Sequence, residues 1–125
     1  MDLDDFKQVD DTVGHTCGDA LLCAVADRLR SVVRGSDVVT RFGGDELVVL
    51  QYPLGDLDES RALAEQIVDV LGRAFQINGH QIVVGASIGI AAAPRDGDGA
   101  DLLLKNADMA LYRGKLNGRG SWQFY

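Results

Sequence analysis

The chain has 125 residues, of which 46% are apolar and 25% charged, which is the size and composition of one globular domain with a single core. Its 12 basic and 19 acidic residues give a net charge of -7, and no basic stripe runs along it, so nucleic acid is excluded as an expected partner. No apolar run approaches the roughly 20 residues of a membrane span, and the N-terminus is acidic. We therefore expect a cytoplasmic domain without direct membrane contact. The spacing of Cys17 and Cys23 fits neither a zinc site nor a disulfide framework, so we expect free thiols.

In the first half of the chain the pattern predicts a long helix and a hairpin. Apolar residues at positions 21, 22, 25, 29 and 33 recur at spacings of three and four, which predicts an amphipathic helix that runs to about Arg34 and stops at Gly35. A polar, Gly-containing stretch at residues 10–18 precedes this helix. Residues 38–42 and 47–50 read as strands joined by the Gly43-Gly44 turn. This arrangement places Asp45 near the tip of a hairpin.

The second half alternates helices with β segments. Residues 57–71 form a helical stripe that ends at Gly72, and Asn78-Gly79 predicts a hairpin between residues 75–77 and 81–84. Residues 86–93 are β-compatible, 94–99 form a loop, 102–115 form a helix, and 122–125 form an aromatic tail. Helices interleaved with hairpins predict an α+β fold with a mainly antiparallel sheet. The Gly-Gly pair lies between strands rather than before a helix, so it is not a dinucleotide-binding loop.

Two carboxylates in this pattern are candidates for a metal site. Asp2 and Asp45 are both flanked by residues expected in the sheet, where carboxylates are uncommon unless they are exposed or bind a ligand. If their strands are neighbours, the two side chains converge on one hard cation, which prefers oxygen ligands and keeps phosphates or water in its shell. Taken singly, each is explained more simply as an exposed turn residue.

Five segments occur in a characteristic order. Residues 2–7 read DLDDFK, 14–19 read GHTCGD, 41–47 read RFGGDEL, 86–91 read ASIGIA, and 107–119 begin with ADMALY and end with GR. Together they resemble the GGDEF domains of diguanylate cyclases along the whole chain. The resemblance implies a ferredoxin-like, palm-type nucleotidyl cyclase fold, α+β, with helices flanking the sheet. It also implies that residues 1–125 are a single GGDEF domain without the family's leading helix and the start of its first strand.

The resemblance implies an activity and a set of catalytic residues. Asp2, Asp45 and the backbone carbonyl of Leu3 match the positions that hold Mg²⁺ or Mn²⁺ against the phosphates of GTP, and Asp45 and Glu46 match the catalytic acids. Glu46 is a second metal ligand or a proton acceptor. In the family's reaction the 3′-hydroxyl of one GTP attacks the α-phosphorus of another, which yields cyclic di-GMP and pyrophosphate.

The resemblance also assigns residues to the substrate. Lys7, Lys115 and Arg119 match positions that hold phosphates, with the backbone N–H groups of residues 5–7 as a further anion cradle. The alternative explanation of Lys115 and Arg119 is structural, because basic side chains stabilise the C-terminus of a helix through its dipole. Asp19 matches the acid that accepts hydrogen bonds from guanine. The alternative explanation of Asp19 is a helix N-terminal residue that accepts from free backbone N–H groups. Asp10 stands where the family has an Asn that contacts guanine.

A regulatory site and a rival function complete the expectations. Arg34 and Asp37 match the family's R-x-x-D product-inhibition site for cyclic di-GMP. The expected partners are GTP, cyclic di-GMP, a second copy in a catalytic homodimer and fused signalling domains. Asp10, Leu47 in place of the final Phe of the signature, and Gly114 in place of a helical Ala depart from the family. They leave open a rival reading, an inactive GGDEF domain that senses GTP or cyclic di-GMP and regulates a fused phosphodiesterase.

Overall fold

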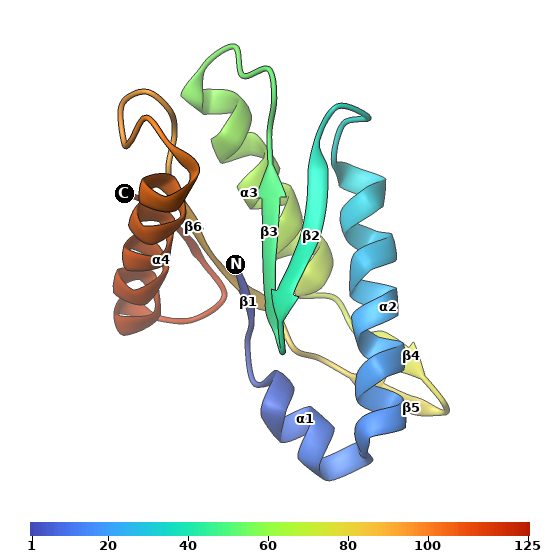
Figure 1. The fold of residues 1–125 in the computed structure, drawn as a ribbon. Coiled ribbons are helices and arrows are strands. Elements are labelled where there is room, and N and C mark those ends of the chain that lie inside the picture. The colour runs from blue at the N-terminus through green and yellow to red at the C-terminus, as the bar shows by residue number, and fades with distance from the viewer.

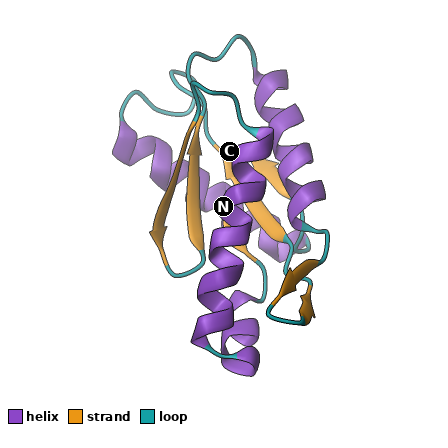
Figure 2. Ribbon diagram, turned by 90° about the vertical axis from the view of Figure 1, so that its right-hand side faces the viewer, coloured by secondary structure: helices purple, strands orange, loops and turns teal.

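The computed structural model describes residues 1–125 and contains two sheets and four helices. The main sheet has five strands in the order β2-β3-β1-β6-β7, and β4 and β5 form a separate hairpin. Helices lie on both faces of the main sheet (Figure 1, Figure 2). The strands are β1 (Asp2–Leu3), β2 (Val38–Gly43), β3 (Glu46–Leu50), β4 (Phe75–Ile77), β5 (His80–Ile82), β6 (Ala86–Ile90) and β7 (Trp122–Phe124); the helices are α1 (Phe6–Val13), α2 (His15–Val32), α3 (Leu57–Leu71) and α4 (Ala100–Asn117).

This architecture confirms the predicted α+β class and its flanked, mainly antiparallel sheet. β1 lies in the centre of the sheet and pairs antiparallel with β3 on one side and β6 on the other. The hairpin over Gly43-Gly44 and the hairpin over Asn78-Gly79 both form, because each turn contains residues that accept a positive φ. The prediction for α3 matches its observed bounds, and the N-cap Asp56 accepts hydrogen bonds from the N–H groups of Asp58 and Glu59.

Several elements differ from the sequence-based expectation. β5 spans His80–Ile82 rather than residues 81–84, and α4 extends two residues further at each end than the predicted 102–115. The polar stretch at residues 10–18 is helical apart from Gly14, since it belongs to α1 and to the start of α2. α2 ends at Val32, two residues earlier than expected, because the Arg34–Asp37 turn begins there. The aromatic tail forms β7, which pairs parallel to β6 and so departs from the antiparallel pattern. Packing against neighbouring elements, rather than local periodicity, specifies α1 and β7.

A single core fills the space between the sheet and the helices. It consists of 17 buried residues, and burying each large apolar side chain contributes roughly 1.5–3 kcal/mol. Cys17 belongs to this core and Cys23 is exposed, so both thiols are free, as expected. None of the helices combines the length and hydropathy needed to cross a membrane. The most deeply buried large side chains are Phe75, Leu3, Leu21, Leu29, Leu71 and Val25.

Helix α4 packs against β6 at a position without a side chain. A Cβ atom at Gly89 would lie 2.0 Å from the carbonyl oxygen of Ala107 and 2.5 Å from the backbone nitrogen of Leu111. The glycine therefore lets the helix backbone rest directly on the strand backbone. Lys115 and the following turn are carried on this helix, so the contact at Gly89 sets their distance from the sheet.

Candidate functional site

A pocket of about 510 Å³ lies where the end of β1, the β2–β3 turn, the start of α1 and the end of α4 meet. It gathers residues that are far apart in the sequence, and five of the predicted site residues are among them. The lining residues are Leu3, Asp5, Phe6, Lys7, Gln8, Asp11, Thr12, Asp45, Lys115 and Arg119. Three of these are basic side chains and three are carboxylates, so the pocket offers cations for an anionic ligand and oxygens for a metal ion within one lining.

Asp2 and Lys115 meet directly beside this pocket. The Lys115 ammonium donates to Oδ2 of Asp2 at 2.5 Å, and both side chains are largely buried, with 26% and 19% of Lys115 and Asp2 exposed. The other carboxylate oxygen, Asp2 Oδ1, is buried and has no hydrogen-bond partner. A buried carboxylate oxygen without a donor is costly, so it marks a place where a ligand is expected.

The unpartnered Asp2 oxygen is one of the donors that the predicted metal site requires. Leu3 follows Asp2 on β1 and lines the pocket, and its N–H donates to the backbone oxygen of Asp45 at 3.1 Å, which holds the Asp45 turn against β1. No group of three or more His, Cys, Asp or Glu side chains converges. Two carboxylates and a carbonyl are oxygen donors of the kind that a hard divalent cation takes when phosphates and water complete its shell.

The start of α1 forms the opposite wall of the pocket. Asp5 precedes the helix with φ 58°, in the left-handed region, and Lys7 lies in its first turn. The first N–H groups of a helix have no intrahelical partner and carry partial positive charge. The predicted anion cradle at residues 5–7 is therefore a helix N-terminus that borders the pocket.

The residues expected to read guanine lie on α1 and α2, next to the lined region. Asp10 Oδ2 lies 2.7 Å from Nδ1 of His15, and Asp10 Oδ1 would lie 2.1 Å from a Cβ at Gly18. Gly18 therefore leaves room for the Asp10 carboxylate. Asp19 follows on α2 and is exposed, with no polar partner. Asp11 and Thr12 line the pocket, whereas Asp10 and Asp19 do not.

Glu46 is set apart from the other predicted catalytic residues. It is the first residue of β3 and stands opposite Asp2 in the strand register. Its side chain is exposed, and it is not among the residues that line the pocket. The strand pairing thus brings Glu46 close to Asp2 without placing it on the pocket wall.

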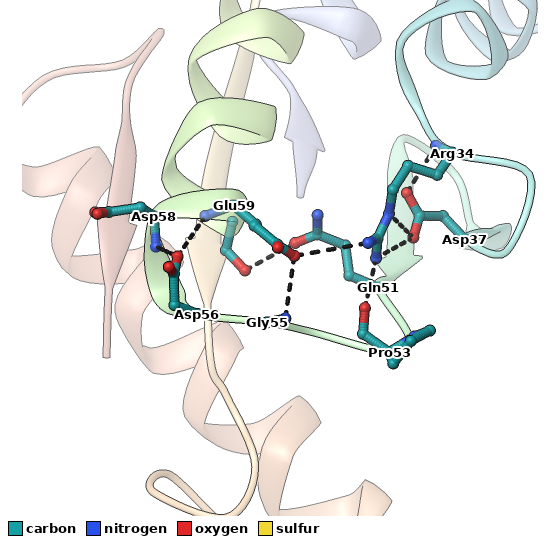
Figure 3. Close-up of polar contacts among 9 residues, drawn as sticks. Arg34, Asp37, Gln51, Pro53, Gly55, Asp56, Asp58 and Glu59 are labelled. Carbon is teal, nitrogen blue, oxygen red and sulfur yellow. Dashed lines mark hydrogen bonds and ion pairs between the residues drawn. The ribbon is translucent and has the colours of Figure 1, made fainter.

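The Arg34–Asp37 turn forms a second cluster on a different part of the surface (Figure 3). The Arg34 backbone N–H donates to Asp37 Oδ2 at 2.8 Å, and its guanidinium donates to Asp37 Oδ1 at 3.0 and 3.2 Å. The guanidinium also donates to the carbonyl of Pro53 at 2.9 Å and lies 3.6 Å from Glu59 Oε2. Glu59 in turn accepts from the N–H of Gly55 at 3.1 Å. The Arg34 guanidinium therefore already contacts Asp37, Pro53 and Glu59.

Electrostatics in this cluster follow from the buried carboxylate. Only 1% of the Asp37 side chain is exposed, and burial by itself raises the pKa of that carboxyl. The hydrogen bonds from the side chain and backbone of Arg34 outweigh this effect, so the pKa of Asp37 lies below its ordinary value. The same side-chain hydrogen bond raises the pKa of Arg34.

Sequence reasoning missed one buried acid next to the site. Asp4 is 4% exposed and accepts from Ser87 and from the backbone of Gly120, and Arg119 approaches it. The only signal in the sequence is its place two residues after Asp2, just beyond the end of β1, and this predicts nothing about its distant partners. A larger hollow of about 750 Å³ between α4 and the C-terminus contains none of the predicted site residues.

Comparison with known proteins finds relatives along the whole chain. The family model described as the diguanylate cyclase GGDEF domain matches residues 1–121. The bifunctional diguanylate cyclase/cyclic di-GMP phosphodiesterase MucR of Pseudomonas aeruginosa is 44% identical over 125 residues, which are 100% of this chain and 18% of MucR. The cyclic di-GMP phosphodiesterase NbdA of the same organism is 42% identical over 125 residues, 100% of this chain and 16% of NbdA.

A solved structure extends the comparison to the fold. The crystal structure of the GGDEF domain of TpbB from Pseudomonas aeruginosa superposes with a TM-score of 0.94 and 37% identity, and the match covers 98% of this chain and 77% of that one. The chain spans less than a fifth of the length of MucR and of NbdA. These relatives are therefore much longer proteins, to which this chain corresponds as one part.

Proposed function

Because the chain belongs to the GGDEF family of diguanylate cyclase domains, we propose that it is the cyclase domain of a larger cytoplasmic signalling protein and condenses two GTP into cyclic di-GMP and two pyrophosphates. The observation that carries this proposal is the buried, unpartnered Oδ1 of Asp2 beside the pocket that Lys7, Lys115 and Arg119 line. It provides an anionic ligand for a cation where Lys7, Lys115 and Arg119 provide cations for phosphates.

Asp2, Asp45 and the carbonyl of Leu3 hold Mg²⁺ or Mn²⁺ in this proposal. The bound cation supplies charge neutralisation on the phosphates and eases ionisation of the attacking hydroxyl. Lys115 exchanges its contact with Asp2 for a phosphate oxygen when GTP binds, and Arg119 and Lys7 hold the remaining phosphate charge. The N–H groups at the start of α1 add neutral donors to the same anion.

The reaction then requires positioning of two substrates. The 3′-hydroxyl oxygen of one GTP bonds to the α-phosphorus of the other, the bond from that phosphorus to the pyrophosphate oxygen breaks, and Glu46 accepts the hydroxyl proton. The 3′-hydroxyl of the second nucleotide then attacks the α-phosphorus of the first in the same way, which closes the ring and releases the second pyrophosphate. Asp19 and Asp10 accept from the guanine N–H groups and select guanine over adenine. Each domain holds one GTP, so the active form is a homodimer in which two pockets face each other. Arg34 and Asp37 bind the product and limit its accumulation.

A second function is favoured by Asp10. Its carboxylate is paired with His15 and cannot donate the hydrogen bond of the family's amide, which weakens the hold on guanine. The second candidate is a domain that does not turn over and instead senses GTP or cyclic di-GMP for a fused enzyme. The match to NbdA, which is named a phosphodiesterase, is consistent with that role.

Incubation with GTP and Mg²⁺ separates the two candidates. The 125-residue chain and its full-length parent are each incubated with GTP, or with ATP as the control, and cyclic di-GMP and pyrophosphate are quantified by chromatography. Cyclic di-GMP from GTP alone supports the cyclase. Binding of GTP or cyclic di-GMP by calorimetry without any product from either protein supports the sensor, and the Arg34→Ala variant then tests the product site.

A further inference from the structure

Asp4 is a buried acid whose contacts all come from hydrogen-bond donors or a cation. Ser87 donates from its hydroxyl to Oδ1 at 2.8 Å, and the backbone N–H of Gly120 donates to Oδ2 at 3.0 Å. A guanidinium nitrogen of Arg119 lies 3.6 Å from Oδ1. Only 4% of Asp4 is exposed. A carboxylate this deeply buried is stable only with such partners, so the arrangement is specific rather than incidental.

These contacts join three segments that carry the site. Asp4 follows β1, the strand of Asp2, and its own N–H donates to the carbonyl of Gly85 at 3.1 Å. Ser87 belongs to β6, and its hydroxyl oxygen also accepts from the Gly120 N–H at 3.2 Å. The turn at Gly120 connects α4 to β7. Asp4 therefore fixes this turn relative to the strand that bears the metal ligand.

Arg119 is the residue whose position depends most on this anchor. It lies between Gly118 and Gly120, whose φ values of 129° and 71° belong to the region that favours glycine. A glycine on each side of Arg119 leaves the turn free to change direction unless another contact holds it. The Arg119 side chain is 56% exposed and its one ion pair is with Asp4, while the same side chain lines the phosphate pocket.

We propose that Asp4 is a positioning residue for the reaction, which orients Arg119 toward the phosphates of GTP by binding both its guanidinium and the backbone that follows it. The inference rests on the proposed function, because it requires GTP in this pocket. Asp4 does not act as a metal ligand in this scheme, since its oxygens face Ser87, Gly120 and Arg119 rather than the unpartnered oxygen of Asp2. Small displacements of a substrate-binding group have large effects on catalysis, so its loss is measurable.

The test compares Asp4→Asn, Arg119→Ala and the double variant in the full-length parent. The asparagine keeps the size of the side chain and one acceptor, but loses the charge that attracts Arg119. We expect Asp4→Asn to raise the KM for GTP about tenfold with kcat nearly unchanged, because Arg119 binds the phosphates before and during the reaction. The double variant is expected to be no worse than Arg119→Ala alone. The Mg²⁺ concentration for half-maximal rate is expected to stay the same.

Three results overturn the inference. Multiplying effects of the two substitutions mean that Asp4 does not act through Arg119, a shifted Mg²⁺ requirement makes Asp4 a metal ligand, and an unchanged KM removes any role. If Asp4→Asn does not fold, as judged by thermal melting, Ser87→Ala carries the same test, because it removes the hydroxyl that fixes Asp4, and an unchanged KM again overturns the proposal.

Failure of the proposed function is distinguishable from failure of this inference. If the wild-type parent makes no cyclic di-GMP but binds GTP, the same variants are compared by the Kd for GTP, where Asp4→Asn is expected to weaken binding about tenfold. A wild-type protein that neither binds nor converts GTP refutes both proposals. A wild-type protein that is active while Asp4→Asn has unchanged kinetics refutes only the positioning role.

Discussion

The Asp2–Lys115 pair and the Arg34–Asp37 turn both join a basic side chain to an acid, but they are built in opposite ways. The first pair brings together residues 113 positions apart and leaves Asp2 Oδ1 buried without a partner. The second closes within four consecutive residues, and the carboxylate of Asp37 accepts three hydrogen bonds from Arg34. The difference lies in how much of each cluster is still available to a ligand.

This contrast predicts different behaviour toward ligands. A site with a buried, unpartnered oxygen gains from any cation that reaches it. A site whose arginine is already bound to Asp37, Pro53 and Glu59 must release one of these contacts before a phosphate can replace it. We therefore expect the pocket to depend strongly on its ligands for activity and stability, and the turn to be stable by itself.

The largest effect is expected from Asp45→Ala. Loss of one metal-binding carboxylate is expected to lower GTP turnover by about 10³-fold, the scale of removing one preorganised charge from an active site. Binding of cyclic di-GMP at Arg34 is expected to be unchanged, as measured by calorimetry. The control is Asp98→Ala, an exposed loop acid away from the pocket. Equal loss of both ligands would show that the two regions are one site.

Lys115→Met is expected to destabilise the domain in a way that a divalent cation repairs. Without its partner, the largely buried Asp2 carboxylate is left uncompensated, which we expect to lower the free energy of unfolding by about 2 kcal/mol. Urea denaturation with and without millimolar Mg²⁺ measures both effects. Lys105→Met, an exposed lysine on the same helix, is the control. A variant that Mg²⁺ fails to restabilise argues against a cation at Asp2.

Asp37→Asn tests the closed turn through pH. Removing the charge-assisted hydrogen bonds is expected to cost about 2 kcal/mol near neutral pH. The folded pKa of Asp37 lies below its ordinary value of 3.8, so its contribution is present above that pH and is lost as the pH falls through the folded pKa. The gap between wild type and variant in denaturation midpoint should thus close below pH 3.8. Asp27→Asn, from the exposed pair with Arg30, should show no comparable gap.

The smallest effect is expected from Glu59→Gln. Glu59 competes with a ligand phosphate for Arg34, so neutralising it is expected to tighten cyclic di-GMP binding by about threefold, the scale of one exposed ion pair. The glutamine still offers an oxygen to the Gly55 N–H. Asp58→Asn is the matched control, because Asp58 pairs with Arg61 instead. Weaker binding in Glu59→Gln would mean that Glu59 supports the ligand rather than opposing it.

The same contrast explains what the sequence could predict. The Asn78-Gly79 hairpin and α3 depend on residues close in the chain, and both were predicted from local pattern. The Arg34–Asp37 turn is equally local, but its two residues were singled out by the family resemblance, and the turn ends α2 earlier than its periodicity predicted. Asp4 was not predicted, because its partners Ser87 and Gly120 are 83 and 116 positions away. Nothing near Asp4 in the chain indicates which residues the fold will place against it.

The helix and strand that were missed share this cause. α1 has apolar residues at helical spacing, Phe6, Val9 and Val13, but it is only eight residues long and so depends on its packing on α2. β7 is short and parallel to β6, and a parallel partner cannot be recognised from the tail itself. The family resemblance supplied candidate site residues across the chain, but not the contacts among them, such as Asp2 with Lys115 or Asp10 with His15.

Gly89 gives the pocket a mechanical property. Because Gly89 has no side chain, the backbones of α4 and β6 are in direct contact there, and α4 cannot move closer to the strand. The alignment of Lys115 with Asp2 is thus set by a hard contact 26 residues before the lysine in the chain. A displacement of α4 away from β6 would therefore separate Lys115 from Asp2 even if nothing entered the pocket itself.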